Sequence, residues 1–418
     1  MNRHETPTIT TRAQAAALDQ ADPLADMRDR FVLRDGLVYL DGNSLGAMPH
    51  AARERVHTCL DVEWGRDLIA SWNTADWIGL PRKAGAKIAG LIGAGADDVV
   101  VTDSTSINLF KVLAAALALN PERRTIVSER ANFPTDLYVA EGLAALKGQD
   151  HVLHLVEHDD DLMPALTEDV AVLMLTHVDY RTGRMLDMAA ITQAAHATGI
   201  LVVWDLAHSA GALPVDLEGA GADFAVGCGY KYLNGGPGAP AFVYCAPRHQ
   251  GEATQPLSGW FAHAAPFAFE PGFRPAPGID RFLTGTSPVL SLVALDAALD
   301  LWGDVDMSAV REKSIALCDL FIARVQATCP GLTLASPRDG AVRGSQVSFR
   351  HEAAYPIMQA LIARGVVGDF RAPDILRFGF TPLYTRFTDA FDAAAILADI
   401  LASDAWNRPE YHQRSAVT

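Results

Sequence analysis

A lysine lies in the middle of a glycine-rich segment. The segment reads Gly227-Cys228-Gly229-Tyr230-Lys231-Tyr232-Leu233-Asn234-Gly235-Gly236-Pro237-Gly238. Because it connects two predicted strands, Lys231 is expected at the rim of an open α/β sheet, where ligands of such sheets bind. An amine there can form a Schiff base with a carbonyl compound. Taken alone, the segment fits a solvated surface lysine better.

A carboxylate follows an apolar run earlier in the chain. Asp205 ends Ile200-Leu201-Val202-Val203-Trp204-Asp205, and a carboxylate desolvated in this way needs a cation or a hydrogen-bond donor. The N–H of a pyridinium ring is one such partner. Capping of a helix that begins near Ala207 is an equally good explanation from the sequence.

Hydroxyl groups and an aromatic ring follow two further predicted strands. Thr102-Asp103-Ser104-Thr105-Ser106-Ile107-Asn108 precedes a predicted helix, and free amides at a helix N-terminus can hold a phosphate without basic side chains. Ordinary helix capping is the alternative. Phe133, in Asn132-Phe133-Pro134-Thr135-Asp136, could cover a flat ring, although a core phenylalanine is the default. The order along the chain is therefore phosphate cradle, stacking aromatic, carboxylate and lysine.

The elements that must position these residues alternate between short β-rich runs and amphipathic Ala/Leu-rich stretches, which is typical of βαβ units around a mainly parallel sheet. The predicted strands are Val99–Thr102, Thr125–Ser128, His151–Val156, Ala171–Thr176, Ile200–Asp205, Phe224–Gly227 and Ala241–Tyr244. The predicted helices between them are Ile107–Leu119, Thr135–Lys147 and Ala189–Thr198.

The second half of the chain has a different pattern. Residues 255–288 are rich in Gly, Pro and Phe without a helical period, which indicates a long functional loop. Helices are predicted after it at Ser291–Trp302, Ser308–Ala327, Pro356–Ala363 and Thr388–Ala402, with strands at Gln346–Phe349 and Leu376–Phe378. We expect an N-terminal arm (1–60) for small-domain and dimer contacts, a large cofactor-binding domain (61–290) and a small α+β domain (291–418).

Composition excludes several classes of function. The 418 residues carry a formal net charge of −16, so nucleic acid or an acidic membrane surface would be repelled. The five cysteines are scattered, which predicts neither a metal site nor a disulfide framework and fits a reducing cytoplasm. The Met1–Glu5 stretch lacks the apolar core of a signal peptide, and no apolar run is long enough to span a bilayer.

The arrangement resembles the fold-type I enzymes that use pyridoxal 5′-phosphate (PLP), and over most of the chain it is similar to the kynureninase family. The resemblance rests on segments quoted above and on three further ones. It includes Trp204-Asp205-Leu206-Ala207-His208, Phe133-Pro134-Thr135-Asp136 and Tyr230-Lys231-Tyr232-Leu233-Asn234-Gly235-Gly236-Pro237-Gly238, with Leu40-Asp41-Gly42-Asn43-Ser44-Leu45-Gly46, Gly259-Trp260-Phe261 and Gly285-Thr286-Ser287-Pro288.

The resemblance implies a large domain with a mainly parallel seven-stranded sheet, a smaller α+β domain and a homodimer with shared active sites. It implies that Lys231, Asp205 and Tyr230 act in catalysis. The residues implied to hold the cofactor are Thr105, Ser106, Phe133, Asp136, Thr176, Asp205, His208, Tyr230, Lys231, Trp260 and Thr286. Ser44 and Trp64 are implied to contact the substrate. Arg377 is implied to grip its α-carboxylate, a task that suits a guanidinium fork, although Arg377 could instead form a surface salt bridge.

The activity implied by the resemblance is that of a PLP-dependent hydrolase acting on C–C bonds in ketones. It would cleave L-kynurenine to anthranilate and L-alanine, in tryptophan breakdown or in the supply of pyridine-nucleotide precursors. Two residues depart from the pattern: Gly229 stands where a serine is expected, and Thr286 where some members have asparagine. Together with Trp64, Thr286 resembles bacterial-type members that prefer kynurenine to its 3-hydroxy derivative.

Three alternatives remain open at this point. A cysteine desulfurase would need a nucleophilic cysteine on a mobile loop, and none of Cys245, Cys318 and Cys329 follows Lys231 in such a context. An aminotransferase would need a keto-acid acceptor. A fold that has lost its chemistry would lack one of Lys231, Asp205 and Arg377, and all three are present.

Overall fold

The computed structural model describes residues 9–148 and 150–414. The Met1–Glu5 stretch and the rest of residues 1–8, which begin the expected N-terminal arm, lie outside the described residues. The chain divides into two compact units. Unit 1 comprises residues 1–50, 181–184 and 305–418, and unit 2 comprises residues 51–180 and 185–304. None of the described helices is long and apolar enough to cross a membrane.

Unit 2 is built on a seven-stranded sheet with the order β2-β8-β7-β6-β5-β3-β4. Its strands are β2 (Val99–Val101), β3 (Thr125–Glu129), β4 (Val152–Val156), β5 (Val170–Thr176), β6 (Leu201–Asp205), β7 (Phe224–Gly227) and β8 (Phe242–Cys245). Only β8 runs antiparallel to its neighbours, β7 and β2. The carboxyl ends of β2, β3, β5, β6 and β7 therefore meet at one edge of the sheet, and the predicted mainly parallel seven-stranded sheet is confirmed.

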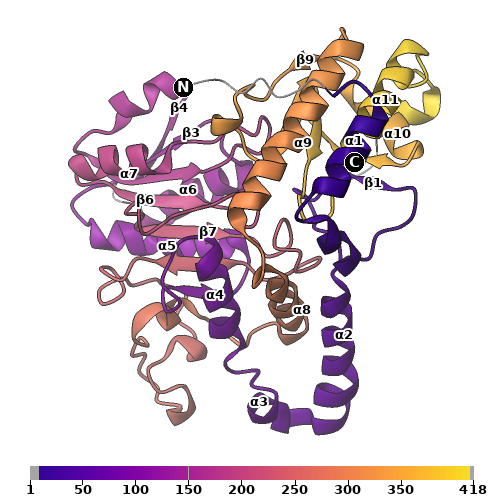
Figure 1. The fold of residues 1–418 in the computed structure, drawn as a ribbon. Coiled ribbons are helices and arrows are strands. Elements are labelled where there is room, and N and C mark those ends of the chain that lie inside the picture. The colour runs from indigo at the N-terminus through magenta and orange to yellow at the C-terminus, as the bar shows by residue number, and fades with distance from the viewer. Residues whose placement is uncertain (1–8, 149, 415–418) are drawn as a thin grey trace. The chain divides into compact units, whose positions relative to one another are not determined.

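The helices of unit 2 form where the sequence has Ala/Leu-rich stretches. They are α2 (His50–Thr58, which begins at the unit boundary), α3 (Ser71–Thr74), α4 (Leu80–Leu91), α5 (Thr105–Leu119), α6 (Pro134–Lys147), α7 (Met188–Ala197) and α8 (Val289–Leu299), with a π-helix at Cys59–Asp67. Helix α5 packs on β5, β7 and β8, and α7 packs on β6 (Figure 1). Every residue of β5 is buried, as expected for a parallel strand covered on both faces.

The long segment 255–288 contains three short 3-10 turns, Trp260–Ala262, Pro266–Ala268 and Gly278–Phe282. This is consistent with the absence of a helical period in its sequence. Another interpretation is corrected by the turn after β6. Residues 206–223, all of them described, form turns rather than an α-helix. Asp205 therefore caps no helix at Ala207, because its carboxylate closes a local turn by accepting from the Ala207 amide at 2.7 Å.

Unit 1 contains a four-stranded antiparallel sheet with the order β12-β13-β10-β9 and a two-stranded parallel sheet of β1 and β11. Its strands are β1 (Val38–Tyr39), β9 (Thr333–Leu334), β10 (Gln346–Arg350), β11 (Val366–Val367), β12 (Asp369–Arg371) and β13 (Ile375–Gly379). Its helices are α1 (Arg12–Ala21), α9 (Met307–Thr328), α10 (Ala354–Ala363) and α11 (Phe387–Ala402). They enclose an apolar core centred on Phe321, Phe349 and Phe378.

Candidate active site

The lysine segment lies directly after β7, at the edge where the carboxyl ends of the parallel strands meet. The Lys231 Nζ atom lies 3.0 Å from His208 Nε2. It is 6.0 Å from the ring centroid of Phe133 and 6.0 Å from that of Tyr230. The structure thus brings together four residues that the sequence separates by up to about a hundred positions.

Two buried carboxyl groups accompany this lysine. Asp205 and Asp136 are 5% and 2% exposed, and Asp205 Oδ2 accepts a hydrogen bond from Thr176 Oγ1 at 3.3 Å. Burial and the negative charge of Asp205 raise the pKa of Asp136 well above its ordinary range. Burial also raises the pKa of Asp205, although Lys231 acts in the opposite direction. The pair is therefore suited to holding one proton between two carboxyl groups.

One oxygen of this pair is a test of whether the site fits a cofactor ring. Among the residues that the structure describes, Asp136 Oδ2 is buried without a hydrogen-bond partner. A buried polar atom of this kind is costly unless a ligand or water satisfies it. A pyridine ring bound between Phe133 and the two carboxyl groups would bring an N–H donor to this place. The residues present therefore fit the ring of PLP.

The residues predicted to cradle a phosphate lie at the start of α5. Thr105 and Ser106 are the first two residues of this helix, and the side chain of Ser104 caps it by accepting from the Ile107 amide at 3.4 Å. The first-turn amides of a helix have no partner inside the helix, and the helix dipole favours an anion there. A phosphate site can therefore form here in an acidic protein.

Gly229 departs from the expected serine for a steric reason. A Cβ atom at this position would lie 2.5 Å from the carbonyl oxygen of Pro240 and 2.9 Å from a methyl group of Leu295. Because the nearer neighbour is a backbone atom just before β8 and the other belongs to the buried Leu295 of α8, a side chain could not be accommodated without moving the backbone. The glycine thus permits the tight connection between β7 and β8.

Tyr230 keeps its proton at neutral pH. The neighbouring Cys228 thiol and burial raise the pKa of its phenol above the ordinary value. A protonated phenol next to Lys231 is a hydrogen-bond and proton donor. His208, which is 5% exposed, completes the polar surroundings of the lysine.

Three predicted site residues are more exposed than this group. Trp260 is 36% and Trp64 is 55% exposed, and Thr286 is exposed as well. In the described part of the chain, none of the three makes a hydrogen bond or ring contact with Lys231, Asp205 or Phe133. Trp64 belongs to the π-helix Cys59–Asp67, a rare helix type that is frequently found at functional sites. The π-helix is anchored by Glu63, whose carboxylate accepts from Trp77 Nε1 at 2.8 Å.

The remaining predicted residues, Ser44 and Arg377, belong to unit 1. Arg377 lies in β13 and is 1% exposed, so it forms a buried ion pair rather than a surface salt bridge. Its Nε donates to Asp369 Oδ1 at 2.7 Å, and its Nη2 donates to Ser44 Oγ at 2.8 Å. Ser44 Oγ in turn donates to Asp369 Oδ2 at 2.8 Å.

Sequence reasoning missed Asp369 and its second partner, Arg371. Arg371 Nη2 lies 2.7 Å from Asp369 Oδ2. Burial alone would raise the pKa of Asp369, but the two guanidinium groups hold it below its ordinary value. The alternation in Asp369-Phe370-Arg371 was a possible signal, because charged residues two apart in a strand share a face.

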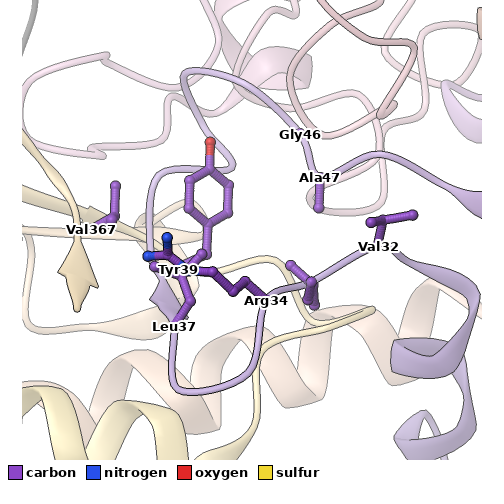
Figure 2. A pocket seen from close by; sticks show the side chains of 8 residues that line it. Val32, Arg34, Leu37, Tyr39, Gly46, Ala47 and Val367 are labelled. Carbon is purple, nitrogen blue, oxygen red and sulfur yellow. The ribbon is translucent and has the colours of Figure 1, made fainter.

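The loop that carries Ser44 borders a hollow of about 560 Å³ in unit 1. Figure 2 shows the Tyr39 ring among the side chains that line it, together with Leu37, Val32 and Val367. The Tyr39 hydroxyl donates to the Leu45 carbonyl oxygen at 2.7 Å. Tyr39 therefore fastens the loop on the side next to Ser44.

Comparisons with known proteins identify the family. The chain is 56% identical to the kynureninase of Burkholderia mallei over 416 residues, which cover 98% of this chain and 100% of that protein. The chain belongs to the kynureninase family. The model of the kynureninase C-terminal domain matches residues 310–397, so both the predicted family and the predicted fold class are confirmed.

Solved structures with the same fold as this kynureninase-family chain include a cysteine desulfurase and a protein called C-DES. A cysteine desulfurase from Thermococcus onnurineus has a TM-score of 0.76 at 18% identity, covering 90% of this chain and 98% of its own. A C-DES variant with glycine covalently linked to its PLP cofactor has a TM-score of 0.77 at 19% identity, covering 89% and 99%. At these identities the likeness shows the fold alone.

Proposed function

We propose that this enzyme carries out the hydrolytic cleavage of the Cβ–Cγ bond of L-kynurenine, which yields anthranilate and L-alanine, at the site around Lys231. The observation that carries the proposal is the buried Asp136–Asp205 pair beside Lys231 and Phe133, in a chain of the kynureninase family. The cofactor is PLP. When bound, it supplies an electron sink for bonds broken at the substrate's carbon atoms.

The carboxyl pair would hold the cofactor ring in its protonated form. Asp205 and Asp136 share a buried environment that disfavours two full negative charges. An N–H group of the ring would donate a hydrogen bond to the buried Asp136 Oδ2 atom or to a carboxylate oxygen of Asp205. The face of the Phe133 ring would cover the cofactor from one side.

Lys231 has two tasks in this proposal. Its Nζ atom would hold the cofactor, and as a free amine it would remove the proton from the substrate Cα. His208 Nε2, 3.0 Å away, is placed to hydrogen-bond to this amine. The protonated Tyr230 phenol can donate a proton at the carbon from which anthranilate departs or can bind the phosphate.

Recognition of the amino-acid end of the substrate is assigned to Arg377 and Ser44. A guanidinium group held through its Nε and Nη2 atoms keeps one orientation. Such a fixed fork suits a carboxylate better than a lysine would. Trp64 would contact the aromatic end of the substrate and, with Thr286, would favour kynurenine over its 3-hydroxy derivative.

The phosphate would be held by the α5 amides, Thr105 and Ser106, and completed by Trp260 and Thr286 from a second copy of the chain. The exposure of Trp260 and Thr286 supports this sharing. We therefore infer a homodimer, with residues 1–60 as an arm that contributes to its contacts, residues 61–290 as the cofactor domain and residues 291–418 as the small domain. The five buried free cysteines support a reducing, cytoplasmic location.

No observation favours a desulfurase activity for this chain. All five cysteines are buried, and burial raises the pKa of the Cys245 and Cys329 thiols. A thiol in such a place makes a poor nucleophile. The physiological role would be in tryptophan breakdown or in the supply of pyridine-nucleotide precursors.

The test is to incubate the PLP-loaded protein with L-kynurenine and to measure anthranilate by fluorescence and alanine by chromatography. We expect both products in equal amounts, and slower turnover of 3-hydroxykynurenine. If the PLP-loaded protein formed no anthranilate, the cofactor assignment would stand and the assignment of L-kynurenine as the substrate would be wrong. Assays with cysteine and with keto acids would then identify the activity.

A further inference from the structure

A lysine side chain is completely buried beneath the phosphate cradle. Lys111 lies on α5, and its side chain is 0% exposed. Its Nζ forms a close ion pair with Asp103 and donates to the Phe282 carbonyl oxygen at 2.6 Å. Because burying an ammonium group is costly without a paired carboxylate, this lysine is a fixed internal charge rather than a solvated one. None of the proposed catalytic steps uses it.

Its partner, Asp103, lies between β2 and the cradle. The backbone of Asp103 has a φ of 45°, a left-handed conformation that is uncommon outside glycine and is found where the surroundings impose it. Its carbonyl oxygen accepts from the Ala241 amide at 2.9 Å, which joins it to the turn that follows Lys231. The carboxylate also accepts from Thr284 Oγ1 at 2.9 Å. Although burial alone would raise the pKa of Asp103, Lys111 and the hydroxyl donors lower it.

Thr284 extends the cluster to two exposed segments. Its carbonyl oxygen accepts from the Phe261 amide at 3.1 Å. A Cβ atom at Gly259 would lie 2.2 Å from this same oxygen, so the chain around Trp260 is packed directly on Thr284. Thr286 follows two residues later. The segments that carry Trp260 and Thr286 and the cradle residues Thr105 and Ser106 are thus tied to one cluster, in which Lys111 is fully buried and Asp103 is partly exposed.

We propose that Asp103, paired with Lys111 and Thr284, is the positioning residue for the phosphate end of the cofactor site. It acts through the segments that it joins and does not itself touch the cofactor. The carboxylate organises the three segments, and Lys111 cancels its charge, so that an anion can bind at the nearby helix terminus. This inference rests on the proposed role of the α5 N-terminus as the phosphate cradle.

The consequence is a loss that depends on the phosphate group. Pyridoxal is the same ring without the phosphate. If Asp103 only stabilised the fold, its removal would weaken the binding of PLP and the binding of pyridoxal to the same extent. If it positions the cradle, PLP binding falls and pyridoxal binding does not. The ratio of the two dissociation constants therefore separates positioning from general stability.

The test uses the full-length apo-protein and the variants Asp103→Asn and Thr284→Val. PLP and pyridoxal are titrated separately, and Schiff-base formation is followed by absorbance. We expect PLP affinity to fall by roughly tenfold or more, as for loss of a buried charge-assisted hydrogen bond, while pyridoxal affinity changes by less than about twofold. Thr284→Ser, which retains the hydroxyl, should bind both ligands as the wild type does.

Asp296→Asn is the matched control, because Asp296 is another carboxylate of unit 2 that is paired with lysine side chains, those of Lys83 and Lys87. It should leave the ratio unchanged. Equal losses for PLP and pyridoxal in Thr284→Val, or no loss, would overturn the positioning role even if Asp103→Asn failed to fold. A wild-type protein that forms no Schiff base with PLP would instead contradict the proposed function.

Discussion

Asp369 and Arg377 lie directly opposite each other on the neighbouring strands β12 and β13, and the carboxylate binds the guanidinium through both of its oxygens. The pair is buried, with side chains 4% and 1% exposed. A guanidinium held in this way cannot rotate without breaking two charge-assisted hydrogen bonds. Asp369 therefore fixes the direction in which Arg377 can meet a substrate carboxylate.

Replacing Asp369 by Asn should weaken substrate binding more than catalysis. We expect KM for L-kynurenine to rise by about tenfold, because one partner of a buried charge pair is lost, while kcat changes by less than about threefold. Steady-state kinetics check this. Asp374→Asn, which removes the partner of Arg350 just before β13, is the control. An unchanged KM in Asp369→Asn would show that Arg377 needs no such support.

The carboxyl group of Asp41 should make substrate binding dependent on pH. Burial and the nearby Asp369 raise the pKa of Asp41 to about 7. Below that pH the group is neutral and the cluster around Arg377 carries one net positive charge. Above it, the added negative charge opposes the substrate carboxylate, so KM should increase as the pH rises through about 7.

The same shift has a stability consequence of defined sign. The folded protein binds a proton at Asp41 between the ordinary and the raised pKa, so this group's stabilising contribution is lost as the pH rises toward 7.

Asp41→Asn cannot titrate and should give a flatter pH profile of KM. If KM depended on pH as steeply in Asp41→Asn as in the wild type, the titrating group would be another residue.

Lys231→Ala should abolish the Schiff-base absorbance and reduce turnover by several orders of magnitude. The exposed Lys147, in the last turn of α6, offers a control, and Lys147→Ala should retain both colour and activity. Absorption spectra and anthranilate release measure the two effects. A Lys231→Ala protein that kept its colour and full turnover would disprove the assignment.

Asp223 should govern stability in acid without affecting the chemistry. It directly precedes β7, at the opposite end of that strand from Lys231. Burial alone would raise the pKa of Asp223, but hydrogen bonds from His196, His249, the Val202 amide and Arg248 hold it well below its ordinary value. The stability contributed by this depressed pKa is present above the ordinary pKa and is lost as the pH falls below it.

The matching variant is Asp223→Asn, which leaves buried donors and a cation without their carboxylate. We expect it to be destabilised by about 3 kcal/mol at neutral pH and by much less in acid. Denaturant unfolding at both pH values measures this, while kcat of the folded protein should stay near that of the wild type. Equal destabilisation at both pH values would exclude a charge effect.

Much of unit 2 could be predicted from sequence because its strands are continuous apolar runs. The strand predicted at Ala171–Thr176 is β5, Val170–Thr176, and most other boundaries differ by one or two residues. Helix α1 was not predicted, although Thr11 and Gln14 form a capping box at its start. The short strands β1, β9, β11 and β12 were also missed, because two or three residues carry too little periodicity to be recognised.

The buried ion pairs were the harder part of the site. A lysine in a helical pattern is normally solvated, although the apolar residues on both sides of Lys111 in α5 were a possible signal of its burial. The pairing of Asp369 with Arg377 can be recognised only when the register of β12 against β13 is known. By contrast, Asp205 and Lys231 could be placed because strand ends of a parallel sheet meet at one edge.

The antiparallel pairing of β7 with β8 also bears on the order in which the site is built during folding. The residues between these strands include Lys231, and the two strands pair along Phe224–Gly227. Closing so short a loop costs little chain entropy compared with bringing Asp136 to Asp205 through intervening strands and helices. The turn that carries Lys231 can thus form through local contacts. The carboxyl pair comes together only when strands far apart in the sequence have paired. A newly synthesised chain that has paired β7 with β8 but not β3 with β5 would present the amine without the groups that bind the cofactor ring.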